Sequence, residues 1–239
     1  MVYPNRGLPV WFGSGQSRDA QYLQAWRKAP ITYSAANVSG ASWSADRYEV
    51  ILGYDQEGGL FNRAVELALS NQFYPPEVMS IVADYSLENR QVRPGDRVLQ
   101  RIPILTYGRL PLLELLTLNE ICEVIQEPRR AGFTYVTTAA HSEVGEWTGR
   151  VEWRDNNEVA LVIEVVSRSR PGSPLFVQRR TRQLQLRAHK LSIEHFLAQL
   201  KGEPPAAPQP FAWALPRLAP VALAAIPILL LFSARSSKR

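Results

Sequence analysis

Apolar and polar residues alternate with a period of two through the middle of the chain. In segment 146–154 the apolar positions Trp147, Val151 and Trp153 alternate with Glu146, Thr148, Arg150 and Glu152. Because successive side chains of a strand point to opposite faces, this pattern indicates a strand with two different sides. Further strands are predicted at 47–53, 78–86, 96–105, 112–126, 133–140 and 159–165.

Helical spacing replaces this alternation elsewhere. A helix is predicted after Gly58-Gly59, where apolar residues recur on one face until Pro75-Pro76 forbids continuation. The longest helix is predicted at 174–200, capped by Ser173 and closed by Gly202. Its apolar stripe is expected at Val177, Thr181, Leu184, Ala188 and Leu191.

The order of these elements predicts the fold. A strand and a helix precede a series of strands, and the long helix follows them. Strands in series pair as antiparallel hairpins, and a long sheet curls. We therefore predict an α+β fold in which a curved antiparallel sheet wraps on the long C-terminal helix. A small apolar ligand is expected in the space between them.

Both ends of the chain differ in composition from this domain, which is predicted at 46–201. Residues 1–45 are weakly patterned and are predicted to be an N-terminal extension, and 202–210 are a proline-rich, semi-rigid linker. Residues 211–239 are mostly apolar with basic residues at the end, which favours a membrane anchor. The alternatives are an interfacial or partner-binding segment and a soluble tail.

A histidine and two carboxylates follow segment 133–140. His141 and Glu143 are expected on the same side of an extended backbone, and Gly145 can turn the chain toward Glu146. Three interpretations remain open. These groups are the polar rim of a ligand pocket, or they pin the sheet by bonding backbone amides or an arginine (Arg168 or Arg170), or they serve catalysis or a metal.

The same segment carries a family resemblance. The matching positions are Tyr135, Thr137, His141, Glu143, Gly145 and Glu146, followed by Ser169-Arg170-Pro171 and Gln178-Arg179-Arg180. In this spacing the chain resembles uncharacterised protein family 0548 over roughly residues 47–200. It departs from the family pattern at Val136, Ala140 and Ser142, which replace two glycines and a proline.

The resemblance implies a START-like (SRPBCC superfamily) helix-grip fold that binds small hydrophobic or lipid-like molecules. The first hypothesis is therefore a non-enzymatic binding module tethered to a membrane. Its predicted ligand-binding residues are Tyr135, His141, Glu143, Glu146, Trp147, Trp153 and Arg170. The second is an enzyme that uses His141 with Glu143 or Glu146, and the third is an interaction protein whose cavity is filled by side chains.

Net charge and sequence motifs limit the partners and cofactors that the sequence predicts. The net charge of +5 is modest, and the basic residues of the long helix are not interleaved with aromatic residues, so no nucleic-acid partner is predicted. No motif calls for a cofactor, metal or catalytic residue. The single cysteine, Cys122, is expected to be a buried thiol. Without an apolar stretch at its start, the domain is predicted to be cytoplasmic, either membrane-associated or free.

Overall fold

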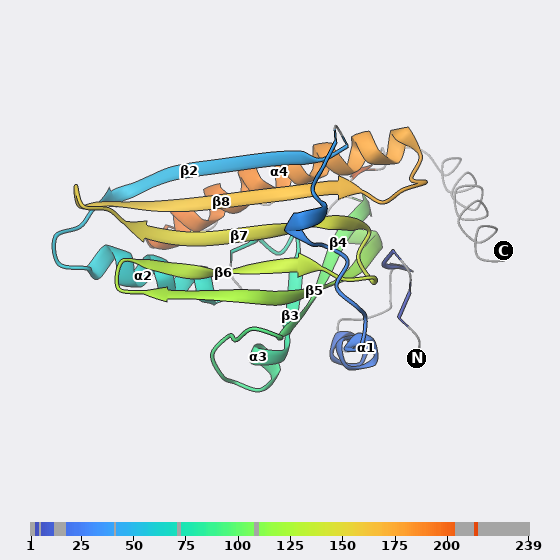
Figure 1. Cartoon of the computed structure of the whole chain (residues 1–239), viewed down its shortest axis with the longest axis horizontal. Helices are drawn as coiled ribbons and strands as arrows, with labels where there is room; N and C mark the ends of the chain where they lie inside the picture. The colour runs from blue at the N-terminus through green and yellow to red at the C-terminus, as the bar shows by residue number, and fades with distance from the viewer. Residues whose placement is uncertain are drawn as a thin grey trace.

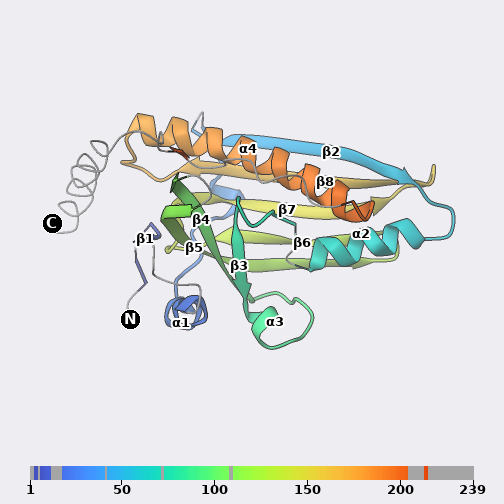
Figure 2. The same cartoon turned by 180° about the vertical axis from the view of Figure 1, so that it is seen from behind.

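The computed structural model contains one curved sheet with a long helix, α4, lying along one of its faces (Figures 1 and 2). It describes residues 3–4, 6–11, 18–40, 42–70, 73–107, 110–203 and 213–214. The helices are α1 (Asp19–Trp26), α2 (Gly59–Leu69), α3 (Asp84–Leu87) and α4 (Leu175–Leu200), with a 3-10 turn at Ala35–Asn37.

The sheet is almost entirely antiparallel. Its main path runs β2-β8-β7-β6-β5-β4-β3, β1 pairs with β5, and β9 pairs in parallel with β4. The strands are β1 (Leu8–Trp11), β2 (Ser44–Tyr54), β3 (Ser80–Ala83), β4 (Arg97–Tyr107), β5 (Leu110–Glu127), β6 (Arg130–Thr137), β7 (Glu143–Trp153), β8 (Glu158–Ser169) and β9 (Trp213–Ala214). The predicted curved antiparallel sheet with a long C-terminal helix is confirmed.

β5 links the two halves of the sheet. Its first part pairs with β4 and its last part with β6, and Cys122 is the extra residue of a bulge between Ile121 and Glu123. A bulge bends a strand and strengthens its twist. It also turns Cys122 outward, so the expected burial of this thiol is wrong. The sulfur is nevertheless partly desolvated, which raises the pKa of Cys122 to about 11 and keeps the thiol protonated.

Each face of the sheet carries its own core. The inner face, toward α2 and α4, packs a continuous apolar cluster that includes Phe133, Trp147 and Phe196. The outer face is covered by α1 near β4 and β5, where Leu23 and Trp26 pack on the sheet. The outer face of β6, β7, β8 and β2 faces the viewer in Figure 1.

Most predicted boundaries differ from the structure by a few residues, and two of them show why. The strand predicted at 78–86 ends at Ala83, because Asp84 accepts the backbone N–H of Arg97 at 2.9 Å and pairs with Arg27 at 3.0 Å. The N-cap of α4 is Pro174 rather than Ser173, and no side chain caps it.

The chain ends contribute to the sheet. β1 and α1, within the predicted extension 1–45, pack on β5 and β4, and Trp213–Ala214 pair with Leu105–Thr106 of β4. The rest of the predicted tail 211–239 and the predicted linker from residue 204 lie outside the described residues. Within the part of the chain that is described, no helix has the length and hydropathy of a membrane span.

Candidate functional site at the seam between the sheet and α4

The face of α4 that meets the sheet is polar for most of its length. In order, and at helical spacing, its residues are Gln178, Arg182, Gln185, His189, Ser192 and Phe196. Of the predicted apolar stripe, Leu184, Ala188 and Leu191 pack in or against the apolar core beside this face, whereas Val177 is 39% exposed. A helix that turns amides and charges toward a sheet builds a polar seam.

Glu143 is the sheet residue at the centre of this seam. Gln185 donates from Nε2 to Glu143 Oε2 at 2.6 Å and to Ser167 Oγ of β8 at 3.4 Å. One turn earlier, both terminal nitrogens of Arg182 donate to the carboxylate of Asp46 on β2. Side-chain hydrogen bonds thus connect α4 to β2, β7 and β8.

A cleft of about 240 Å³, here called the seam cleft, opens at this place. Serine hydroxyls, amides and guanidinium groups line it together with one carboxyl group, from Ser42, Ser44, Glu143, Ser167, Arg168, Ser169, Gln178, Arg179, Arg182 and Gln185. Burial raises the pKa of the Glu143 carboxyl to about 7, while the bond from Gln185 and the charge of Arg182 act in the opposite direction. Near neutral pH this group can donate or accept a hydrogen bond.

Buried polar atoms without a protein partner lie in the same inner layer. Among the described residues, no hydrogen bond reaches the side-chain amide of Asn119, Trp147 Nε1 or His189 Nδ1. Asn119 is fully buried, and the other two residues are 5% exposed. An unsatisfied buried polar group costs about 1–3 kcal/mol. Such groups are normally completed by a ligand or an ordered water.

The strand register relates Asn119 to the seam. Asn119 on β5 is the register partner of Thr137 on β6, and Thr137 Oγ1 accepts the backbone N–H of Gly145 on β7 at 2.9 Å. Glu143 lies two residues before Gly145 and therefore on the same face of β7. The unpartnered amide and the seam carboxyl thus face the same side of the sheet, on β5 and β7, which are separated by β6.

His141 and Arg170 shape the loop that precedes β7. The ring nitrogen Nδ1 of His141 accepts the backbone N–H of Glu143 at 3.0 Å. Arg170 donates to the carbonyl oxygens of His141 and Thr138, both at 2.8 Å, and of Ala139 at 3.1 Å. Burial and then the charge of Arg170 lower the pKa of His141 to about 4, so its ring is neutral. Both side chains fix the position of Glu143, and Arg170 bonds carbonyls instead of carboxylates.

Tyr135 and Trp147 lie side by side on the inner face of β6 and β7. Their rings stack with centroids 5.0 Å apart and planes 12° from parallel. The indole lies over Gly149, where a Cβ atom would come within 2.1 Å of the ring. Burial raises the pKa of Tyr135 to about 12, and the charge of Glu143 acts in the same direction. With Phe73, Phe133 and Phe196, these residues form an aromatic cluster.

Trp153 is remote from this site. It ends β7, about 30 Å from Glu143 along the strand. Its Nε1 donates to the carbonyl oxygen of Asp55 at 2.9 Å, its ring lies 5.9 Å from that of Phe61, and Arg129 stacks over it. The structure therefore gives Trp153 contacts that close the far end of the sheet.

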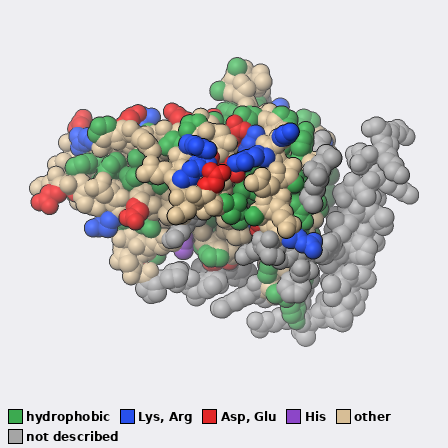
Figure 3. Space-filling view, turned by 90° about the horizontal axis from the view of Figure 1, so that it is seen from below, with side chains coloured by type: hydrophobic (Ala, Val, Ile, Leu, Met, Phe, Trp, Pro, Cys, Tyr) green, Lys and Arg blue, Asp and Glu red, His purple; other side chains and the backbone are tan. Residues whose placement is uncertain are grey.

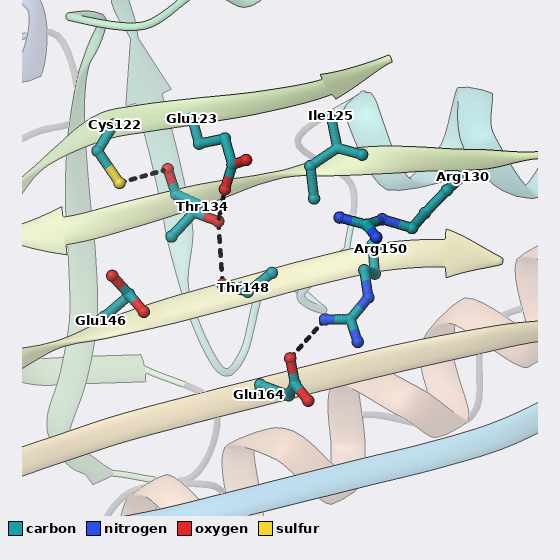
Figure 4. Close-up of a pocket in the computed structure, with 9 residues that line it drawn as sticks. All are labelled: Cys122, Glu123, Ile125, Arg130, Thr134, Glu146, Thr148, Arg150 and Glu164. Atoms are coloured by element: carbon teal, nitrogen blue, oxygen red, sulfur yellow. Dashed lines mark hydrogen bonds and ion pairs between the residues drawn. The ribbon is translucent and has the colours of Figure 1, made fainter. Parts of the chain in front are cut away.

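Glu146 lies on the outer face, opposite Glu143. β7 is regular from Glu143 onward, so a residue three positions later has the opposite orientation. Figure 4 shows Glu146 in a groove of about 320 Å³ on this face, with Glu123 and Thr134 nearby. Burial and then the charge of Glu123 raise its pKa. The expectation that all three polar groups share one rim is wrong for Glu146.

The site also includes residues that the sequence did not single out, namely Asn119, Arg182, Gln185 and His189. α4 turns His189 inward, where its ring lies 5.1 Å from that of Tyr48. The available signal was the helical spacing of the polar residues from Gln178 to Ser192. In the described part of the chain, no group of three or more His, Cys, Asp or Glu is arranged to hold a metal ion.

The fold and the seam together define an α+β protein in which a curved antiparallel sheet grips a C-terminal helix. Residues 29–195 match DUF1990, a domain of unknown function, and the chain belongs to this family. No curated protein matches the sequence.

Several solved structures are similar to the chain. A hypothetical protein, jhp0584, from Helicobacter pylori has 16% identity and a TM-score of 0.47, over 71% of this chain and 95% of that one. Ara h 8.0201 has 11% identity and a TM-score of 0.41, over 67% and 99%. The di-domain ARO/CYC protein StfQ from the steffimycin biosynthetic pathway has 9% identity and a TM-score of 0.43, over 67% and 51%.

Proposed function

We propose that the protein binds a small, largely apolar molecule with at least one hydrogen-bonding group between the inner face of the sheet and α4. The observation that carries this proposal is the set of buried atoms on Asn119, Trp147 and His189 that have no partner among the described residues. Trp147 belongs to the aromatic cluster, and His189 lies one turn along α4 from Gln185, which lines the seam cleft. An amphipathic molecule would contact the aromatic rings with its apolar part and these atoms with its polar part.

Under this proposal, some of the predicted ligand-binding residues contact the molecule and others act indirectly. Tyr135, Glu143 and Trp147 would contact the molecule, because their side chains face the inner layer. His141 and Arg170 would act indirectly by holding Glu143 in place. The segments that resemble family 0548 fall inside the part matched by DUF1990, and we infer that both describe one relationship.

Two variants test the binding site. Asn119→Leu removes two unpartnered polar atoms, so the ligand-free protein is expected to be at least as stable as the wild type. The control is Thr138→Val, because Thr138 is equally buried but its hydroxyl bonds Leu118 O at 2.8 Å and the N–H of Ala140 at 3.2 Å. This control is expected to lose about 1–2 kcal/mol.

Native mass spectrometry of the protein from its producing cells would identify a co-purifying molecule, and thermal shift would then measure its binding. Asn119→Leu is expected to lose most of the ligand-dependent rise in Tm, whereas Thr138→Val keeps it. Absence of a co-purifying molecule, together with a clear destabilisation by Asn119→Leu, would favour an interaction protein with a filled interior.

Glu143 supports a second candidate, an enzyme on the same scaffold. Its carboxyl lines the seam cleft, and a pKa of about 7 suits a group that gives and takes protons near neutral pH. Glu143→Gln would then abolish turnover of a bound molecule while its affinity changes little. An equal loss of affinity and turnover would assign Glu143 to binding alone.

A separate proposal concerns the apolar residues 211–239, which we infer to tether the domain to a membrane. Their composition supports it, with basic residues after the apolar run. Deleting 215–239 keeps the pairing of β9 with β4 and is expected to move the protein from the membrane fraction to the soluble fraction. Unchanged fractionation contradicts the anchor.

A further inference from the structure

The outward side of α4 combines exposed apolar side chains with basic ones. Leu175, Phe176 and Leu186 are 71%, 57% and 42% exposed. At helical spacing, Arg179, Arg187 and Lys190 share this exposed side. These six residues are called the outward face of α4.

The charge of this face is not balanced along the helix. α4 contains no Asp or Glu before Glu194, which lies 3.9 Å from Lys190. The acidic groups that contact α4 from the sheet, Asp46 and Glu143, bond Arg182 and Gln185 on the opposite side. The outward face is therefore both apolar and positively charged.

We propose that the outward face of α4 docks on an anionic phospholipid surface. A helix that lies in a membrane interface buries apolar side chains among the headgroups while its Lys and Arg residues contact anionic lipids. Each basic residue near such a surface contributes about 1 kcal/mol. Arg179 also lines the seam cleft, so docking would bring the cleft to the lipid surface.

Charge argues against two other occupants. Two copies of the chain that met through this face would bring like charges together, which is unfavourable. Residues 211–239 contain four basic residues, Arg217, Arg235, Lys238 and Arg239, and no acidic residue, so this segment is not complementary to the face either. An anionic lipid surface satisfies both the charge and the apolar side chains.

Flotation of the full chain with vesicles tests the proposal. Binding is expected to vesicles of phosphatidylcholine with phosphatidylserine, to be at least about tenfold weaker with phosphatidylcholine alone, and to decrease with added salt. Binding to neither vesicle overturns the proposal, and so does equal binding to both that Arg179→Glu with Arg187→Glu leaves unchanged.

Two double variants identify the surface. Arg179→Glu with Arg187→Glu, and Leu175→Ser with Phe176→Ser, are each expected to weaken binding to the anionic vesicles at least about tenfold. The matched controls are Lys28→Glu with Arg63→Glu, and Leu87→Ser with Tyr107→Ser, which change exposed residues on other elements in the same way. Circular dichroism checks that all four remain folded.

The results of these experiments distinguish a lipid surface from the other possible partners of the outward face of α4. Equal weakening by the charge control means that net charge alone drives binding and overturns the proposal. Unchanged binding of both α4 variants assigns the contact to another segment, such as 211–239. A dimer in sedimentation velocity that Phe176→Ser dissociates assigns the face to a second copy. None of these results depends on a ligand in the seam cleft.

Discussion

The two faces of the sheet treat polar groups in opposite ways. On the outer face, charged side chains of β2, β7 and β8 and of the turn after β7 form a closed series of ion pairs. The series runs through Arg47, Glu49, Arg154, Glu152, Arg150 and Glu164. On the inner face, Asn119, Trp147 and His189 keep buried atoms without a partner among the described residues. Buried polar atoms without a partner, which on the outer side include Trp26 Nε1 beneath α1, are normally completed by a ligand or an ordered water.

Ion pairs also occur where α1 covers the outer face. Arg101 on β4 donates to both oxygens of Asp19 on α1, at 2.5 and 3.0 Å, and to Glu114 at 2.6 Å. The side of the molecule shown in Figure 3 likewise has acidic and basic side chains next to each other. Burial of charge alone therefore does not mark a functional site in this protein.

The largest expected effect concerns this buried pair. Arg101→Met leaves Asp19 unpaired with its side chain 3% exposed, and it is expected to cost about 3–5 kcal/mol of the free energy of unfolding. Urea denaturation measures the loss. Adding Asp19→Asn removes the unpaired charge and should restore part of the stability. A loss below about 1 kcal/mol would show that pairing is not what stabilises the covered outer face.

The second expected effect is a pH dependence of the free energy of unfolding that comes from Glu143 on the inner face. The pKa of Glu143 is about 7 in the folded protein, against 4.5 ordinarily, so the folded state binds this proton more tightly. The resulting stability is fully present below about pH 4.5 and is lost as the pH rises through 7, by up to about 3 kcal/mol. Glu143→Gln should remove this dependence.

Denaturation of both proteins at about pH 5 and about pH 8 measures the difference. His141 and His189, whose pKa values are lowered to about 4 by burial, act with the opposite sign. Their stability is present above pH 6.5 and is lost as the pH falls toward 4. Both proteins share these histidines, so the difference isolates Glu143. Parallel pH profiles would contradict a buried carboxyl at the seam.

A smaller loss of stability is expected at Arg170, whose charged side chain donates to backbone carbonyl oxygens. Arg170→Met removes three hydrogen bonds to the loop before β7 and is expected to cost about 2 kcal/mol. Because this loop positions Glu143, the pKa of Glu143 should also move toward 4.5 in Arg170→Met. Denaturation of the variant over the same pH series would detect this change. A loss of stability with an unchanged profile would show that Glu143 is held by β7 alone.

The elements were predictable because their patterns are local. Alternation and helical spacing identified most strands and α4 within a few residues. Parity alone separates Glu143 from Glu146 once β7 is known to begin at Glu143, but the sequence suggested a turn at Gly145. Gly145 instead permits close strand approach, since a Cβ atom there would lie 2.4 Å from the carbonyl oxygen of Val166.

The site was less predictable because it depends on contacts distant in sequence. α4 has an apolar stripe and a polar stripe, and packing buries parts of both, because Ala188 joins the apolar core while Gln185 and His189 turn toward the sheet. Asn119 has no local signal, because its burial follows from pairing with Val98 on β4 and Thr137 on β6. A polar residue inside an apolar strand is informative only when its partners are known.

The smallest effect is expected on the open outer face. Arg47 pairs with Glu49 and Glu164, but its side chain is 51% exposed. Exposed ion pairs contribute about 0–1 kcal/mol and weaken with salt. Arg47→Met should therefore change the free energy of unfolding only slightly, and the change should vanish in high salt. Arg150→Met, at a site only 12% exposed, should cost more. A large, salt-independent loss for Arg47→Met would mean that the series of pairs acts as one unit, and the outer face would then resemble a core rather than a solvated surface.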